Sequence, residues 1–175
     1  NTTTKPVIVS NSCVYSLCPV PRNLKDEQIK KKKKNGGVIH LNFYSGFVDS
    51  NFERRNDAFF MNHKAERDSL LKTVTDPYFA SVKLFAKYPD EVKDLRPPLG
   101  MLMDHLDYIV KLIGADHVGL GSDFDGITSA PQQLDDITNM PLIAKELLAR
   151  GYSKKDVQKI LGGNFMRIFE ANMQE

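Results

Sequence analysis

Three short apolar runs along the chain, each bounded by glycine, proline or polar residues, predict β-strands. They are PVIVS at Pro6–Ser10, GVIHLNF at Gly37–Phe43 and HVGLGSD at His117–Asp123. Their almost continuous apolar character indicates strands that are buried on both faces, as in a parallel sheet. Polar side chains gather at the C-terminal ends of the runs, namely Asn11, Asn42 and Asp123.

Helical patterns occupy the stretches between these runs. From Asn23 to Gly36, acidic residues come first and lysines last, which suits the helix dipole, with Asn23 as the expected N-cap and Gly36 as the stop. Leu99–Ile113 repeats its apolar residues with the helical period of 3.6 and predicts a helix with one buried face.

After the third run, the pattern predicts one helix ending near Gly151 and another capped by Ser153. The second is expected to break at Gly162 and to resume as far as Met173. Residues 153–175 are therefore expected to form C-terminal helices.

Strands that alternate with helices predict βαβ units and an α/β fold with a parallel sheet. Polar residues at the C-terminal strand ends lie where an α/β barrel places its active site. Residues 50–98 are too many for a plain connection and contain two helix-like stretches, Phe52–Lys72 and Asp76–Pro89. We expect a helical insertion there.

Composition indicates one globular domain and no obligatory polyanionic partner. The chain has 175 residues, is 41% hydrophobic and carries a formal net charge of +2, too small to require nucleic acid or a membrane surface. No apolar run approaches the ~20 residues of a transmembrane segment. The chain starts only a few residues before a predicted strand, so we expect it to be a piece of a longer protein.

Cysteine and histidine show no metal-binding spacing. Cys13 and Cys18 are the only cysteines and form no CxxC motif, and Cys13 is expected to be a small packing residue. The four histidines form no HxH or HExxH pair, so each is expected at the surface or in packing.

The stretch GLGSDFDGI, residues 119–127, offers the clearest candidate for chemistry. Asp123 ends the third run, and a carboxylate there can bind an ammonium group, a metal ion or a reacting water. The alternative is that Asp123 only caps a loop or the next helix. The glycines lack the GxGxxG spacing of a nucleotide-binding loop.

Two basic features follow the first strand. Arg22 lies in the proline-rich loop PVPRNL, where a guanidinium could grip a carboxylate through two hydrogen bonds, or could be an ordinary surface arginine. The run Lys30–Lys34 covers every side of the predicted helix, and a solvated, partly frayed helix end is favoured over a nucleic-acid site.

Four stretches, PVIVSNSCVYSLCPVPRNL, NGGVIHLNFYSGFVDS, RPPLGMLMDHLDYIVKLIGADHVGLGSDFDGI and LGGNFMRIFEAN, resemble successive pieces of the zinc membrane (renal) dipeptidase family in its bacterial branch. The resemblance implies a (β/α)₈ TIM barrel, of which residues 1–175 would be the C-terminal part. The three strands would correspond to the sixth, seventh and eighth of the barrel.

The resemblance also implies a chemistry: two zinc ions and the hydrolysis of dipeptides. Arg22 falls where the family arginine receives the dipeptide carboxylate, and Asp123 where the family aspartate meets the free amino end and the reacting water. Asn11, however, stands where the family has a histidine ligand to zinc. The other family ligands would lie upstream of Asn1, so we expect this chain to bind no zinc and to be inactive by itself.

Other consequences of the resemblance stay open. Family enzymes allow a homodimer at full length and occur in several compartments, so the location of this chain is undetermined. The partner of a cysteine like Cys18 in the animal enzymes is missing, which excludes that disulfide here. Two alternative functions remain: a non-catalytic descendant that keeps a dipeptide-sized site, and an interaction module that uses Lys30–Lys34 on an acidic partner.

Overall fold

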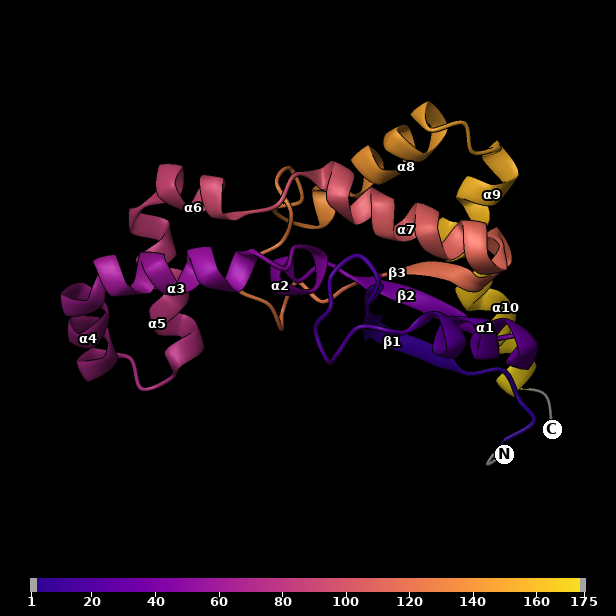
Figure 1. Cartoon of the computed structure of the whole chain (residues 1–175), viewed down its shortest axis with the longest axis horizontal. Coiled ribbons are helices and arrows are strands. Elements are labelled where there is room, and N and C mark those ends of the chain that lie inside the picture. The colour runs from indigo at the N-terminus through magenta and orange to yellow at the C-terminus, as the bar shows by residue number, and fades with distance from the viewer. Residues whose placement is uncertain (1–2, 174–175) are drawn as a thin grey trace.

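The computed structural model describes residues 3–173 and is built around one parallel sheet (Figure 1). Its strands are β1 (Ile8–Ser12), β2 (Val38–Asn42) and β3 (Val118–Ser122), in the order β1-β2-β3. The prediction that the first strand stops at Ser10 is wrong. Its register shifts between Val9 and Ser12, and this bulge lets the chain pair with β2 as far as Ser12.

Helices connect and cover the strands. In chain order they are α1 (Asp26–Asn35), α2 (Ser45–Val48), α3 (Phe52–Asn62), α4 (Lys64–Thr73), α5 (Pro77–Lys87), α6 (Pro89–Leu95), α7 (Leu99–Ile113), α8 (Met140–Ala149), α9 (Lys154–Gln158) and α10 (Asn164–Met173). Short 3₁₀ turns lie at Ala115–His117 and Ile137–Asn139, and a π-helical turn joins α9 to α10 at Lys159–Gly163.

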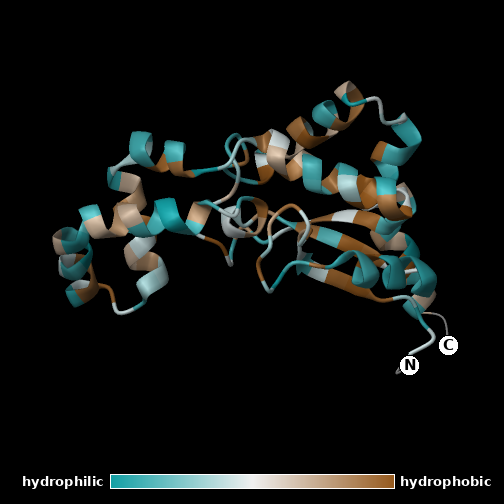
Figure 2. Ribbon diagram, in the orientation of Figure 1, coloured by the Kyte–Doolittle hydropathy of each residue, from teal (hydrophilic) through white to brown (hydrophobic). Residues whose placement is uncertain are grey.

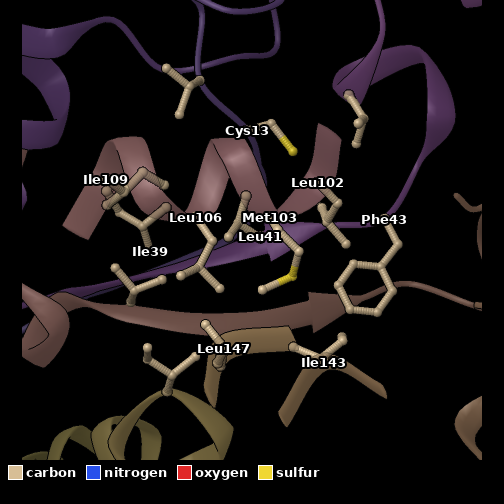
Figure 3. Close-up of a cluster of buried hydrophobic side chains, with 14 of the residues drawn as sticks. Cys13, Ile39, Leu41, Phe43, Leu102, Met103, Leu106, Ile109, Ile143 and Leu147 are labelled. Atoms are coloured by element: carbon tan, nitrogen blue, oxygen red, sulfur yellow. The ribbon is translucent and has the colours of Figure 1, made fainter. Parts of the chain in front are cut away.

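The main core lies between the sheet and α7, as the sequence period predicted. Figure 3 shows Leu102, Met103 and Leu106 of α7 among side chains from the strands and from α8. Ile39 and Leu41 of β2 are fully buried in this cluster. In Figure 2 the strand ribbons carry hydrophobic segments that hydrophilic residues interrupt, and β1 is only partly buried. The α/β class is therefore confirmed, while the complete barrel stays a prediction.

The helix that follows β1 differs from the prediction in two ways. Its N-cap is Lys25, and Asn23 instead turns its side chain into the loop before the helix. The lysine run does not fray the helix: α1 continues through it to Gly36, which adopts a left-handed φ of 74° and ends the helix as predicted. Ile29 is the one buried residue of α1, and the Tyr108 hydroxyl of α7 also donates to the Asp26 carboxylate of this helix at 2.9 Å.

The insertion expected at residues 50–98 consists of α3, α4, α5 and α6, which extend away from the sheet (Figure 1). The helix expected over Phe52–Lys72 breaks at His63, and α6 has no counterpart among the predicted helices. The insertion has a small core of its own around Phe59, Leu84 and Phe85.

The C-terminal helices begin and break where the sequence predicted, as far as Met173, and residues 174–175 of the predicted stretch lie outside the described residues. The Ser153 hydroxyl accepts the Asp156 backbone N–H at 3.1 Å, and Gly162 has the non-helical φ of 163° at which the helix breaks. Asn164 then donates to the carbonyls of Ala115 and Val118, fixing α10 near the start of β3. Among residues 3–173, no helix combines the length and the apolar character that a bilayer crossing demands.

Candidate functional site

The polar ends of all three strands meet in one cluster. Asn11 Nδ2 donates to Asp123 Oδ2 at 3.0 Å, and Asn42 Nδ2 donates to the same oxygen at 2.9 Å. Asn42 also donates to Asn11 Oδ1. The expectation that these three residues lie together is met, although up to 112 residues separate them in the chain.

The backbone at the end of β3 is bent to bring the Asp123 carboxylate into this cluster. Ser122 and Asp123 have positive φ angles of 32° and 75°, which non-glycine residues adopt only when their surroundings hold them there. The Gly126 N–H donates to the Asp123 carbonyl at 2.9 Å and closes the turn. A Cβ on Gly126 would lie 2.5 Å from Asp123 Oδ1, so only glycine lets the carboxylate keep this position.

Hydrogen bonds from Asn23 and Ser12 hold the loop that carries Arg22 in place. Asn23 accepts the Cys13 N–H at 2.9 Å and donates to the carbonyls of Cys18 and Phe47, and its side chain is buried. The Ser12 hydroxyl donates to the Arg22 carbonyl at 3.0 Å. The exposed Arg22 guanidinium lies over the Phe47 ring at 5.7 Å from its centre.

Arg22 and Asp123 line the same pocket, which has a volume of about 360 Å³. The rest of its lining comes from Asn11, Tyr44, Phe47, Gly126, Ile127 and Thr128. Within the part of the chain that the structure describes, neither Arg22 nor Asp123 forms an ion pair. The pocket thus presents one unneutralised cation and one unneutralised anion.

Asp123 also borders a larger cavity of about 840 Å³, between the insertion and the loop that follows β3. Val82 and Phe85 of α5 give this cavity apolar walls. Its arginine, Arg96, is engaged with Asp135 and with the carbonyls of Ala130 and Pro131. The cavity therefore borders the Asp123 carboxylate, but its one arginine is already paired with Asp135.

Tyr44 closes the pocket wall next to β2. Its hydroxyl donates to Glu53 Oε1 at 2.7 Å, and burial, together with this carboxylate, raises the pKa of Tyr44. Its backbone N–H donates to Asn42 Oδ1 at 2.6 Å. A Cβ on Gly46 would lie 2.5 Å from Glu53 Oε1 and 2.7 Å from the Tyr44 ring, so a larger residue there would displace these side chains. Sequence reasoning missed Tyr44, whose only signal was its place two residues after β2, and the role of Asn23, for which the chain gave no signal.

The described residues do not fit a zinc site. Among residues 3–173, no three histidine, cysteine or acidic side chains gather as a metal ion would require. The cysteine thiols are buried, and burial raises the pKa of both, that of Cys18 to about 11. Since zinc takes thiolate, imidazole or carboxylate, neutral thiols and amides make a poor donor set.

Of the histidines, His105 has the best-defined role, and it is structural. Its Nδ1 accepts the Val14 N–H at 3.0 Å, and its Nε2 lies 3.0 Å from the Val48 carbonyl. His117 bonds to the Gly37 carbonyl, and His63 pairs with Glu91 in the insertion. These three follow the expectation that the histidines serve packing or the surface.

Sequence comparison finds relatives along the entire chain. Residues 1–175 match the family described as membrane dipeptidase, peptidase family M19. A Klebsiella pneumoniae protein, described as uncharacterized and located in the pqqA 5′ region, is 30% identical over 98% of this chain and 49% of its own length. Dipeptidase aclJ of Aspergillus oryzae is 30% identical over 96% of this chain and 30% of its own length. The chain therefore spans about half or less of these relatives.

Solved structures agree with this relationship. The probable dipeptidase PvdM from Pseudomonas aeruginosa superposes with a TM-score of 0.71 at 26% identity, over 99% of this chain and 46% of its own. A metallo peptidase from Rhodobacter sphaeroides, liganded with a phosphinate mimic of the dipeptide L-Ala-D-Ala, has a TM-score of 0.67 at 23% identity, covering 95% of this chain and 36% of its own. The three strands and their helices thus have counterparts in larger molecules.

Proposed function

The chain belongs to the membrane dipeptidase family, peptidase family M19, and from that premise we propose that its strand-end pocket binds the two charged ends of a dipeptide. Arg22 would receive the terminal carboxylate, and Asp123 the terminal ammonium group. In the longer protein this binding would hold a dipeptide for hydrolysis.

The observation that carries this proposal is the pair of unneutralised opposite charges in one small pocket. Charged side chains that share a pocket without pairing with each other suit a ligand that carries both complementary charges. A dipeptide is such a zwitterion. A longer peptide would set a neutral amide against one of the two charges, a mismatch that costs about 1–3 kcal/mol.

Each of the two side chains has a defined task in this proposal. The planar Arg22 guanidinium can donate two parallel hydrogen bonds to a carboxylate, and its contact with Phe47 keeps it above the pocket. Asp123 accepts hydrogen bonds from an ammonium group through the oxygen that the amides leave free. Together they orient the peptide bond between two fixed points.

The proposal also covers the parts of the enzyme that lie beyond these residues. We infer a (β/α)₈ barrel to which residues 1–175 contribute three strands, and a zinc-dependent hydrolase that pairs as a homodimer at full length. The length of the relatives supports the larger fold, since the matched region is about half of the Klebsiella pneumoniae protein. The zinc ions and the homodimer rest on the family resemblance alone. Because the described residues do not fit a zinc site, we assign no catalytic step to them beyond holding the substrate.

Calorimetric titration with end-blocked ligands tests the proposal. Ala-Ala should bind at least about tenfold more tightly than N-acetyl-Ala-Ala or Ala-Ala-amide, since each block removes one charge. Arg22→Ala should abolish the preference for the free carboxylate, and Asp123→Asn the preference for the free amine. Arg54→Ala, which removes an exposed arginine from α3, is the matched control and should change nothing. Equal affinity for free and blocked ligands would contradict the proposal.

A further inference from the structure

The hydrogen bonds around Asp123 use its two oxygens unequally. Both amide donors, from Asn11 and Asn42, reach Oδ2, whereas Oδ1 lies beside Gly126. A carboxylate can only accept hydrogen bonds, so the amide nitrogens must be the atoms that face it. The two asparagines therefore fix which oxygen of Asp123 is occupied and which is left for a ligand.

Neither asparagine has an amide oxygen free to coordinate a metal ion, because both oxygens already accept hydrogen bonds. Asn11 uses its nitrogen on Asp123 and its oxygen on Asn42. Asn42 is fully buried, and its oxygen accepts the Tyr44 N–H. An amide nitrogen offers no ligand to a metal ion, and the amide oxygen of Asn11 would have to leave Asn42 before it could serve as one.

We propose that Asn11 and Asn42 are positioning residues that hold Asp123 as a metal-free receptor for a primary ammonium group. The ligand class is the amino terminus of a zwitterionic dipeptide, so the inference rests on the function proposed above. It departs from the family's metal chemistry at this strand end, where Asn11 takes the place of a histidine.

The electrostatics of the cluster agree with this role. The two amide N–H groups aimed at Oδ2 hold the carboxylate in place but, unlike a lysine or arginine partner, bring no positive charge to it. The full negative charge is then available at the pocket, at a fixed angle. A freely rotating carboxylate would lose conformational entropy when it binds a ligand. The asparagines already restrict Asp123 in the folded chain, so less entropy is lost on binding.

The test compares two ligands on two proteins. In the unmodified chain, N-acetyl-Ala-Ala should bind at least tenfold more weakly than Ala-Ala. In Asn11→Ala this ratio should fall to threefold or less, while the Kd of N-acetyl-Ala-Ala changes less than twofold, because the acetylated ligand does not use Asp123. A purely structural role for Asn11 would weaken both ligands equally and keep the ratio, which would overturn the inference.

Two further arms complete the experiment. Asn11→Gln restores a side-chain amide and should recover part of the ratio, and Asn11→Ser replaces Asn11→Ala if that variant does not give a folded chain.

Ala-Ala affinity should stay within twofold whether a chelator or an equimolar zinc salt is added. A requirement for zinc would overturn the metal-free claim. If Ala-Ala shows no preference over its acetylated form in the unmodified chain, both this inference and the proposed function fail. If the preference exists but Asn11→Ala keeps it, only this inference fails.

Discussion

Asparagine side chains fix the strand ends and the loop beside them. Asn23 was predicted to cap a helix, since asparagine is a common N-cap, but its side chain is committed to Cys13, Cys18 and Phe47. The sequence pattern predicted that Asn11 and Asp123 lie at the C-terminal strand ends, and they meet there because the ends of parallel strands share one edge. Their hydrogen-bond partners could not be predicted, because the choice depends on side-chain positions that only the folded sheet defines.

Gly126→Ala tests how closely the pocket depends on the Asp123 carboxylate. The new Cβ would lie 2.5 Å from Oδ1, so the carboxylate must move from its present position. We expect dipeptide affinity to fall at least about tenfold, because losing one charge-assisted hydrogen bond of about 1.5–3 kcal/mol weakens binding by about 10- to 150-fold. Calorimetry would measure this, with Gly100→Ala as the control, because the nearest atom to its Cβ is 3.7 Å away. Unchanged affinity in Gly126→Ala would show that Oδ1 does not face the ligand.

Among the elements, α7 organises the molecule. Its apolar face was predicted from a period of 3.6, and five apolar residues of that face are buried: Leu102, Met103, Leu106, Ile109 and Ile113. The same helix also buries His105, which periodicity could not identify as a hydrogen-bonding residue. The insertion was harder to predict, because α4 and α6 bury no residue and show only weak patterns.

The buried histidine of α7 predicts a pH dependence of stability. Burial lowers the pKa of His105, whose neutral ring must accept the Val14 N–H. As pH falls below the unfolded value of about 6.5, the unfolded chain takes up a proton that the folded chain refuses. Stability is therefore complete above that pH and declines below it, by at most about 1.4 kcal/mol per unit.

Urea denaturation at pH 7.5 and 5.5 measures this decline. His105→Gln keeps a donor and an acceptor but cannot titrate, so its stability should fall by about 1 kcal/mol less than that of the unmodified chain. His40, whose pKa burial also lowers, is present in both proteins and cancels in the comparison. Equal declines in the two proteins would contradict the role of His105.

At the scale of the whole molecule, the two outer strands of the described sheet, β1 and β3, each have one edge that pairs with no other described strand. Large apolar side chains of the C-terminal region also reach solvent: Leu161, Phe165, Met166, Phe169 and Met173 are 41–68% exposed. The sequence predicted the α/β class because local period and turn residues encode it. It cannot show which surfaces are covered in a longer protein, since those contacts are not local.

The open sheet and the exposed C-terminal side chains predict that the chain by itself self-associates. Unpaired strand edges and contiguous apolar surface both favour contact between copies. Light scattering should report oligomers at micromolar concentration, and a hydrophobic dye should bind. Phe165→Lys with Phe169→Lys, which interrupts a stacked aromatic pair on α10, should reduce both signals. A monodisperse monomer without dye binding would contradict this expectation.

A structure of the chain with a bound dipeptide is the most direct test of the central claim, that Arg22 and Asp123 hold the two ends of one zwitterion. The account predicts an Ala-Ala molecule in the pocket, with its carboxylate on the Arg22 guanidinium and its ammonium group within hydrogen-bond distance of Asp123 Oδ1, while Asn11 and Asn42 keep their contacts with Oδ2. A dipeptide bound elsewhere, or one whose ammonium group does not reach Asp123, would contradict it.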